Sequence, residues 1–244
     1  MTDMKTAVTH TEQDGNGIAS SAIAEDAYLF GPVVVKIQQA ERVWKLTPHG
    51  QTLGEGMAKA RHALVGKTAI EIGVGTGVHA IAALKLGVRE IDVTDIEAAA
   101  LESAALNATR NGVAYRKSWV QDWMRFEPEE PYNLVLCNPP FCKAGKPDRR
   151  FFIQSLIQEA PRFLRRGGHL LFVQSSMANF ALTEQELSDA GFYFTPVHET
   201  RKRFRDYYFQ EPGFLEESRR VKDGFEEIEG TYVETLRVYL CTKP

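Results

Sequence analysis

A glycine-rich segment is the first candidate for chemistry in this sequence. Residues 71–77 read EIGVGTG and join the apolar run 68–72 to a helical pattern. The glycines permit a tight turn and let a ligand lie against the backbone, in the crevice where parallel strands end. Val78 occupies the third glycine position of the G-x-G-x-x-G fingerprint, which argues against NAD. Alone, the segment is also compatible with a tight turn that binds nothing.

Acidic residues follow the next two predicted strands. Asp95 comes about twenty residues after the glycines, where a carboxylate can accept hydrogen bonds from the ribose hydroxyls of an adenosine-containing ligand. Asp95 can equally cap the helix that follows it. Asp122 can accept from an adenine amino group while Trp123 packs on the ring, although a simple Asp turn explains it as well.

The segment 138–141 reads NPPF and directly follows the apolar run 132–137. Two prolines fix two φ angles and remove two N–H donors, which leaves carbonyls and the Asn138 amide as acceptors. The Asn138 amide oxygen and the Pro139 carbonyl can each accept one proton of a planar amine or amide. Phe141 can stack on that planar group. The alternative, a strand terminator with a core phenylalanine, is disfavoured by the glycine segment and Asp95 on successive strands.

Strands and helices alternate from residue 67 onward. The predicted strands are 68–72, 90–94, 115–120, 132–137 and 169–174, and the predicted helices are 77–86, 97–110, 148–164 and one with a Thr183 and Glu186 capping box that ends at Gly191. The alternation predicts an α/β fold with right-handed crossovers: a Rossmann-like, doubly wound, mostly parallel sheet of seven strands. Because no helical crossover separates 192–200 from 233–242, these runs predict an antiparallel C-terminal strand pair.

The chain divides into three expected parts. Residues 1–26 are polar and lack periodicity, which predicts a flexible tail. Residues 27–65 form an N-terminal extension, with a hairpin of strands 33–37 and 42–46 followed by a helix. Residues 66–244 form the main domain, in which the long, Glu-rich connection 206–232 is a possible lid.

Two further segments carry plausible chemistry with plainer alternatives. Residues 201–209 interleave basic and aromatic side chains, as in contacts with single-stranded RNA, but a solvated strand end explains them equally well. His49 lies in the segment TPHG before the glycines, where it can face a substrate or simply occupy a turn.

Composition excludes several classes of protein. The 244 residues are 43% hydrophobic and 25% charged, which predicts a folded globular chain. A net charge of -3 argues against binding to nucleic acid through the overall field. Three cysteines without a CxxC pair disfavour a disulfide framework and a metal site, and they favour the cytoplasm. No apolar run approaches the roughly eighteen residues of a membrane span, so no membrane association is expected.

Taken together, these motifs resemble class I S-adenosylmethionine-dependent methyltransferases that carry an Asn-Pro-Pro-aromatic motif. The resemblance covers about Thr47 to Val173. Residues 142–145 are similar to the small methyltransferase domain of ribosomal-RNA guanine-N2 enzymes, which tend to have His in place of Cys142. Residues 160–164 are similar to release-factor glutamine methyltransferases. The chain lacks an obvious copy of the helical N-terminal domain of the latter and the duplicated first half of several of the former, which leaves the substrate open.

The resemblance implies S-adenosylmethionine as cofactor, no metal, and methyl transfer to an exocyclic amino or amide nitrogen. A nucleobase in RNA is the favoured acceptor, with protein glutamine or a small metabolite as alternatives. A nucleotide-dependent oxidoreductase is disfavoured by the glycine spacing, and a non-catalytic adapter by the intact 138–141 motif. The residues assigned to catalysis are Asn138, Pro139, Pro140 and Phe141, and those assigned to the cofactor are Glu71, Gly73, Gly75, Gly77, Asp95, Ile96, Asp122 and Trp123.

Overall fold

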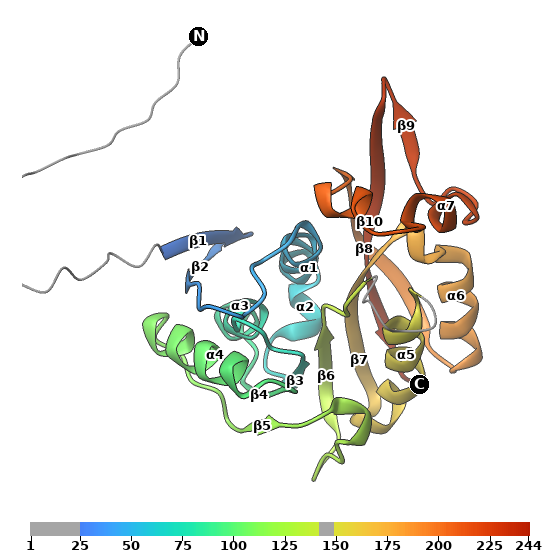
Figure 1. Cartoon of the computed structure of the whole chain (residues 1–244). Coiled ribbons are helices and arrows are strands. Elements are labelled where there is room, and N and C mark those ends of the chain that lie inside the picture. The colour runs from blue at the N-terminus through green and yellow to red at the C-terminus, as the bar shows by residue number, and fades with distance from the viewer. Residues whose placement is uncertain (1–24, 142–148) are drawn as a thin grey trace, which may run out of the picture.

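The computed structural model describes residues 25–141 and 149–244 (Figure 1). Its central sheet has the strand order β5-β4-β3-β6-β7-β10-β8, and the short β9 pairs with β10. The strands are β3 (Thr68–Ile72), β4 (Glu90–Asp95), β5 (Ser118–Val120), β6 (Tyr132–Cys137), β7 (Leu164–Ser175), β8 (Tyr193–Arg203), β9 (Glu226–Ile228) and β10 (Thr231–Thr242). The five neighbouring strands β5, β4, β3, β6 and β7 are parallel, whereas β10 is antiparallel to β7 and to β8. The expected mostly parallel sheet with an antiparallel C-terminal pair is therefore confirmed, with β9 added to the seven strands.

Helices cover both faces of the sheet because successive strand side chains point to opposite faces. The helices are α1 (Pro48–Lys59), α2 (Arg61–Leu64), α3 (Val78–Leu86), α4 (Ala98–Arg110), α5 (Phe151–Phe163), α6 (Phe180–Asp189) and α7 (Phe214–Arg219). On one face, Leu134 of β6 belongs to a buried core with residues of α1, α2, α3 and α4. On the other face, its neighbour Val135 belongs to a second core with residues of α5 and α6. Two cores thus fix the central strands from both sides.

The N-terminal hairpin lies one strand earlier than predicted. It consists of β1 (Glu25–Phe30) and β2 (Val33–Gln38), whereas the predicted strand 42–46 is irregular. Two asparagines of α4 accept from β2: Asn111 from the Lys36 amide at 3.0 Å and Asn107 from the Gln38 amide at 2.9 Å. The two asparagines occupy backbone amides of β2 that a following strand would otherwise pair with. In addition, Arg42 has a φ of 63°, which interrupts the extended chain.

The predicted capping box of α6 is also wrong. The helix begins at Phe180, and the Asn179 side chain accepts from the Leu182 amide at 3.1 Å. Thr183 is buried instead, where its hydroxyl accepts from Arg150 at 2.8 Å. Asn179 has a left-handed backbone, with φ of 62°. Asparagine is one of the few non-glycine residues that adopt this conformation readily. Within the described ranges, no helix is long and apolar enough to span a bilayer.

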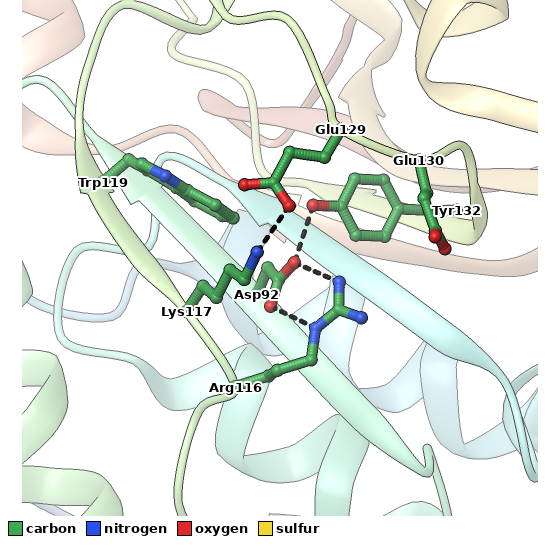
Figure 2. A pocket seen from close by; sticks show the side chains of 7 residues that line it. All are labelled: Asp92, Arg116, Lys117, Trp119, Glu129, Glu130 and Tyr132. Atoms are coloured by element: carbon green, nitrogen blue, oxygen red, sulfur yellow. Dashed lines mark hydrogen bonds and ion pairs between the residues drawn. The ribbon is translucent and has the colours of Figure 1, made fainter.

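The buried carboxylate of Asp92 in β4 joins three segments of the chain, away from the carboxyl edge of the sheet. Asp92 is fully buried and accepts from Arg116 at 2.9 and 2.5 Å and from the Tyr132 hydroxyl at 2.7 Å (Figure 2). These residues line a cavity of about 180 Å³. Because the carboxylate is fully engaged by its neighbours and Tyr132 begins β6, we interpret this cavity as structural.

We expect Arg116→Leu to lower the free energy of unfolding by about 2 kcal/mol, because a buried charge loses its main partner. Urea unfolding followed by circular dichroism measures this. The control is Arg89→Leu, which removes an exposed contact with Glu90 at 3.3 Å and should change stability by less than about 0.5 kcal/mol. Equal effects of the two substitutions would contradict the structural role of Asp92.

Candidate functional site

The pairing of β3 with β6 brings the two principal motifs together. In this parallel pair Ile72 lies opposite Cys137, so Gly73 and Asn138 are the next residues on neighbouring strands. Neighbouring strands are about 4.8 Å apart. On the other side of β3, Ile72 lies opposite Thr94, which places Asp95 at the same edge. The glycine segment, Asp95 and the 138–141 turn therefore lie side by side at the carboxyl edge.

The three glycines of the segment have different surroundings. All three have positive φ, at 72°, 53° and 83° for Gly73, Gly75 and Gly77. A Cβ at Gly73 or Gly75 would meet no atom within 4 Å, whereas a Cβ at Gly77 would lie 2.3 Å from the Tyr115 hydroxyl and 3.1 Å from Ala104. The first two glycines thus face open space, and the third allows close packing of the loop against α4.

Glu71 lies behind the glycine segment and is engaged by its own chain. One carboxylate oxygen accepts from the Ala80 amide at 2.8 Å, and the other lies 3.2 Å from Nδ1 of His79. Burial raises the pKa of Glu71 above its ordinary value. His79 also lies 2.9 Å from the Gly50 carbonyl through Nε2. Glu71 therefore ties β3 to the start of α3 and, through His79, to α1; its direct cofactor contact stays a prediction.

Asp95 does not cap α4, whose N-cap residue is Glu97, and its contact with ribose hydroxyls stays a prediction. One carboxylate oxygen accepts from the Gly75 amide at 3.0 Å, and the other accepts from the Glu97 amide at 3.1 Å, next to the start of α4. Asp95 is half-buried, and an ionised carboxylate has about four acceptor sites, so each oxygen can accept once more. The adjacent Ile96 is 55% exposed, which leaves an apolar side chain beside this carboxylate.

Asp122 forms the simple Asp turn that was the alternative to an adenine contact. Its carboxylate accepts from the Met124 amide at 3.0 Å at the start of the short 3-10 helix Trp123–Arg125. Trp123 is half-buried against the core that contains α5. Both residues lie beyond β5, on the same edge as Asp95, because Val120 pairs with Asp95. Their contacts with an adenine ring stay predictions.

The 138–141 turn begins at the end of β6 and reaches an aromatic cluster. Asn138 and Phe141 are half-buried, and Pro139 is buried. The Phe141 ring is near-parallel to His49, with centroids 6.0 Å apart, and it meets Tyr208 and Phe214 edge-on at 6.5 Å. Cys142 and the rest of 142–148 lie outside the described residues. The segment 206–232 thus contributes aromatic contacts to the last residue of the turn.

A buried carboxylic acid that sequence reasoning missed lies near this turn. Glu234 of β10 is 1% exposed, and its Oε2 lies 3.9 Å from Nε2 of His49. Burial raises the pKa of Glu234 to about 7, although hydrogen bonds and the Arg205 charge act in the opposite direction. Burial, reinforced by Arg205, lowers the pKa of His49 to about 3. In the sequence, Glu234 is only an acidic residue within a strand-like run. Such a residue cannot be assigned a role until its neighbours in the fold are known.

The family described as the methyltransferase small domain matches residues 51–205. A Methanocaldococcus jannaschii protein named "Putative protein N5-glutamine methyltransferase" is 30% identical over 141 residues, which are 52% of this chain and 71% of that protein. Ribosomal RNA small subunit methyltransferase C of Hamiltonella defensa is 35% identical over 118 residues, which are 48% of this chain and 33% of that protein.

The fold is shared with solved structures at low sequence identity. The Thermus thermophilus 16S rRNA N2 G1207 methyltransferase, solved with AdoMet and guanosine, has a TM-score of 0.62 and 15% identity. The alignment covers 91% of this chain and 50% of that one. This chain therefore spans about half of that structure and about a third of the Hamiltonella relative.

The raised pKa of Glu234 makes stability depend on pH. The folded state holds the proton up to about pH 7, whereas an unfolded glutamic acid loses it near 4.5. The stability from protonated Glu234 is thus fully present below pH 4.5 and is lost as pH rises through 7. We expect wild type to lose about 3 kcal/mol relative to Glu234→Gln over this range. Urea unfolding of both proteins at about pH 4.5 and about pH 8 measures this; the same pH dependence in both would contradict it.

Proposed function

The chain belongs to the methyltransferase small domain family and is an S-adenosylmethionine-dependent methyltransferase, and we propose that it methylates an exocyclic amino or amide nitrogen. The observation that carries this proposal is the pairing of Ile72 with Cys137, which sets a glycine turn beside an acceptor-rich turn. We further propose a nucleobase in RNA as the acceptor class. Guanosine accompanies AdoMet in the Thermus structure, which supports this choice.

The residues at the carboxyl edge fit an adenosine-containing cofactor. Gly73 and Gly75 present open space where a side chain would obstruct a ligand, and Asp95 retains acceptor capacity for ribose hydroxyls. The exposed Ile96 offers an apolar surface for the adenine ring. When bound, S-adenosylmethionine supplies a sulfonium methyl group, whose C–S bond breaks as the N–C bond forms while sulfur keeps the electron pair.

We assign the acceptor clamp to the 138–141 turn. The Asn138 amide oxygen and the Pro139 carbonyl each accept one proton of the acceptor –NH2, which aims the nitrogen lone pair at the methyl carbon and favours a pyramidal transition state. In-line positioning of this kind can contribute about 7–11 kcal/mol. The methylated nitrogen is acidic and loses its extra proton to water, so the clamp needs no strong base. Phe141 stacks on the planar group of the acceptor.

A second acceptor class has its own support. The Methanocaldococcus relative is named as a protein N5-glutamine methyltransferase, and a glutamine side-chain amide is also planar and carries two N–H donors. A small metabolite is the third class, consistent with the net charge of -3.

We assign catalysis to residues 66–244, with 27–65 as an extension and 206–232 as a possible lid. The buried free thiols Cys137 and Cys241 support a cytoplasmic location.

Methyl transfer from labelled S-adenosylmethionine into a fractionated cell extract tests this function. The label should enter RNA, and nucleoside analysis should place it on an exocyclic nitrogen. Label in protein glutamine would instead support the second acceptor class. Isothermal titration with S-adenosylmethionine and with NADH provides the independent check. Binding of NADH without binding of S-adenosylmethionine would overturn the proposal.

We expect Gly75→Ala to weaken S-adenosylmethionine binding by about tenfold or more, because the new Cβ enters the open space at the turn. Gly112→Ala is the matched control: it has φ of 69° against 53° at Gly75, and a Cβ would meet no atom within 4 Å at either position. Both variants should lose about 1–2 kcal/mol of stability from the strained backbone. Equal cofactor affinities, measured by isothermal titration, would place the cofactor elsewhere.

We expect Asn138→Ala to lower turnover by about 100-fold while the dissociation constant for S-adenosylmethionine stays within about twofold. The reason is that Asn138 holds the acceptor nitrogen and lies one strand away from the glycine segment. Single-turnover methyl transfer and isothermal titration measure the two quantities separately. Collapse of cofactor binding with this substitution would show that the clamp assignment is wrong.

A further inference from the structure

A third hydrophobic cluster lies apart from the two cores of the sheet and reaches the 138–141 turn. Its buried members are Met177, Phe204, Tyr208 and Phe214, and the half-buried side chains packed against them are Phe141, Leu215, Phe225 and Tyr232. All of these except Met177 and Phe141 come from residues 204–232, between the end of β8 and the start of β10. This long connection is therefore packed against the last residue of the turn by aromatic side chains.

Tyr208 and Phe214 form a stacked pair at the centre of this cluster. Their ring centroids are 4.4 Å apart, the ring planes differ by 13°, and both side chains are fully buried. Gly213 has a φ of 74°, and this left-handed turn directs the ring of the next residue back onto Tyr208. The Tyr208 hydroxyl also donates to Oε1 of the buried Glu234 at 3.3 Å. The pair is thus fixed by packing, by backbone geometry and by a hydrogen bond.

Phe141 meets both rings of this pair in the same way. It lies nearly perpendicular to Tyr208 and to Phe214, at 76° and 89°, with centroids 6.5 Å apart in each case. Edge-to-face contacts are favoured by the charge distribution of aromatic rings, so a rotation of Phe141 would lose both of them. Phe141 is only half-buried, which leaves part of its surface open to a ligand. The stacked pair therefore orients a ring that is still accessible.

Arg149 holds the outer ring of the pair from the other side. Its guanidinium lies over Phe214, 4.4 Å from the ring centroid. The same guanidinium pairs with Glu211 at 3.2 Å and with Glu217 of α7 at 2.6 Å. The Arg149 side chain is only 18% exposed, which strengthens these contacts relative to ion pairs on the open surface. Phe214 thus contacts the end of the 138–141 turn and also the arginine that lies two residues before α5.

We propose that Tyr208 and Phe214 are positioning residues for methyl transfer: their stacked rings hold Phe141 in the orientation in which it stacks on the acceptor. The proposal rests on the proposed function of the 138–141 turn. A side chain that binds a substrate needs neighbours that fix its own conformation, and these two rings supply them. Residues 208–217 of the possible lid therefore support the acceptor side of the site through Phe141.

Removal of either ring tests this role. Tyr208→Leu and Phe214→Leu keep an apolar side chain but lose the aromatic contact with Phe141. Turnover and apparent KM are measured with labelled S-adenosylmethionine and increasing amounts of total cell RNA. We expect the apparent KM for RNA to rise about tenfold while turnover stays within about threefold, because stacking binds ground state and transition state alike. A merely structural role would lower the fraction of active protein, and hence turnover, at an unchanged KM.

Two further variants separate the ring from general packing. Tyr208→Phe keeps the ring without its hydroxyl, so the apparent KM should stay within about twofold of wild type. Phe225→Leu is the matched control, because Phe225 belongs to the same cluster but its ring contacts are with Phe204 at 5.2 Å and Tyr232 at 5.5 Å. An unchanged KM in both ring-loss variants, or an equal rise in Phe225→Leu, overturns the proposal.

A milder variant decides the question if the leucine variants do not fold, which isothermal titration with S-adenosylmethionine reveals. Arg149→Met removes the guanidinium from the Phe214 ring and leaves both buried rings in place. It should raise the apparent KM for RNA about threefold without changing cofactor affinity. Arg220→Met is its control, since Arg220 pairs with Glu216 at 2.9 Å on the exposed surface. An unchanged KM in Arg149→Met would then overturn the proposal.

The proposed function and the positioning role fail separately. If wild type does not bind S-adenosylmethionine, or labels neither RNA nor protein, the proposed function itself is wrong. If wild type labels protein in place of RNA, the protein fraction becomes the varied acceptor in the same measurements. If wild type methylates its acceptor and the ring-loss variants retain the wild-type KM, only the positioning role is wrong.

Discussion

The register between β3 and β6 is the constraint on which the rest of the structure depends. Because Ile72 lies opposite Cys137, the two strands end together, and a glycine turn and a proline turn continue from them side by side. A shift of one residue would reverse the side chains of a strand between the two cores. Leu134 and Val135 pack into opposite cores, so helices on both faces oppose such a shift.

Around this register, the two turns are held in different ways. The glycine turn is flexible by composition, and it is fixed by hydrogen bonds: Asp95 accepts from the Gly75 amide, and Asn107 of α4 donates to the Thr76 carbonyl at 3.0 Å. The Asn-Pro-Pro turn is rigid by composition, and its end packs against the aromatic side chains of His49, Tyr208 and Phe214. The proposed cofactor side is therefore built from backbone and carboxylate, and the proposed acceptor side from rings and buried polar groups.

Sequence reasoning succeeded where local pattern decides structure. The runs 68–72 and 132–137 coincide with β3 and β6, because buried parallel strands are continuously apolar and end at distinctive turns. It failed where a distant side chain decides. The N-cap of α6 is Asn179, because the Thr183 hydroxyl is engaged by Arg150. The hairpin ends with β2, because asparagines of α4 accept from the amides of that strand. Glu234 escaped notice for the same reason: its unusual environment comes from Tyr208 and His49, which are remote in sequence.

We propose that the glycine turn and the Asn-Pro-Pro turn form one site, with cofactor on the first and acceptor on the second. A crystal structure of the chain with S-adenosylmethionine tests it most directly. We expect ribose hydroxyls on Asp95 and a methyl group directed at Asn138, with room for a nitrogen about 3–3.5 Å from the methyl carbon. A cofactor bound with its methyl group pointing away from Asn138, or bound elsewhere on the chain, would contradict it.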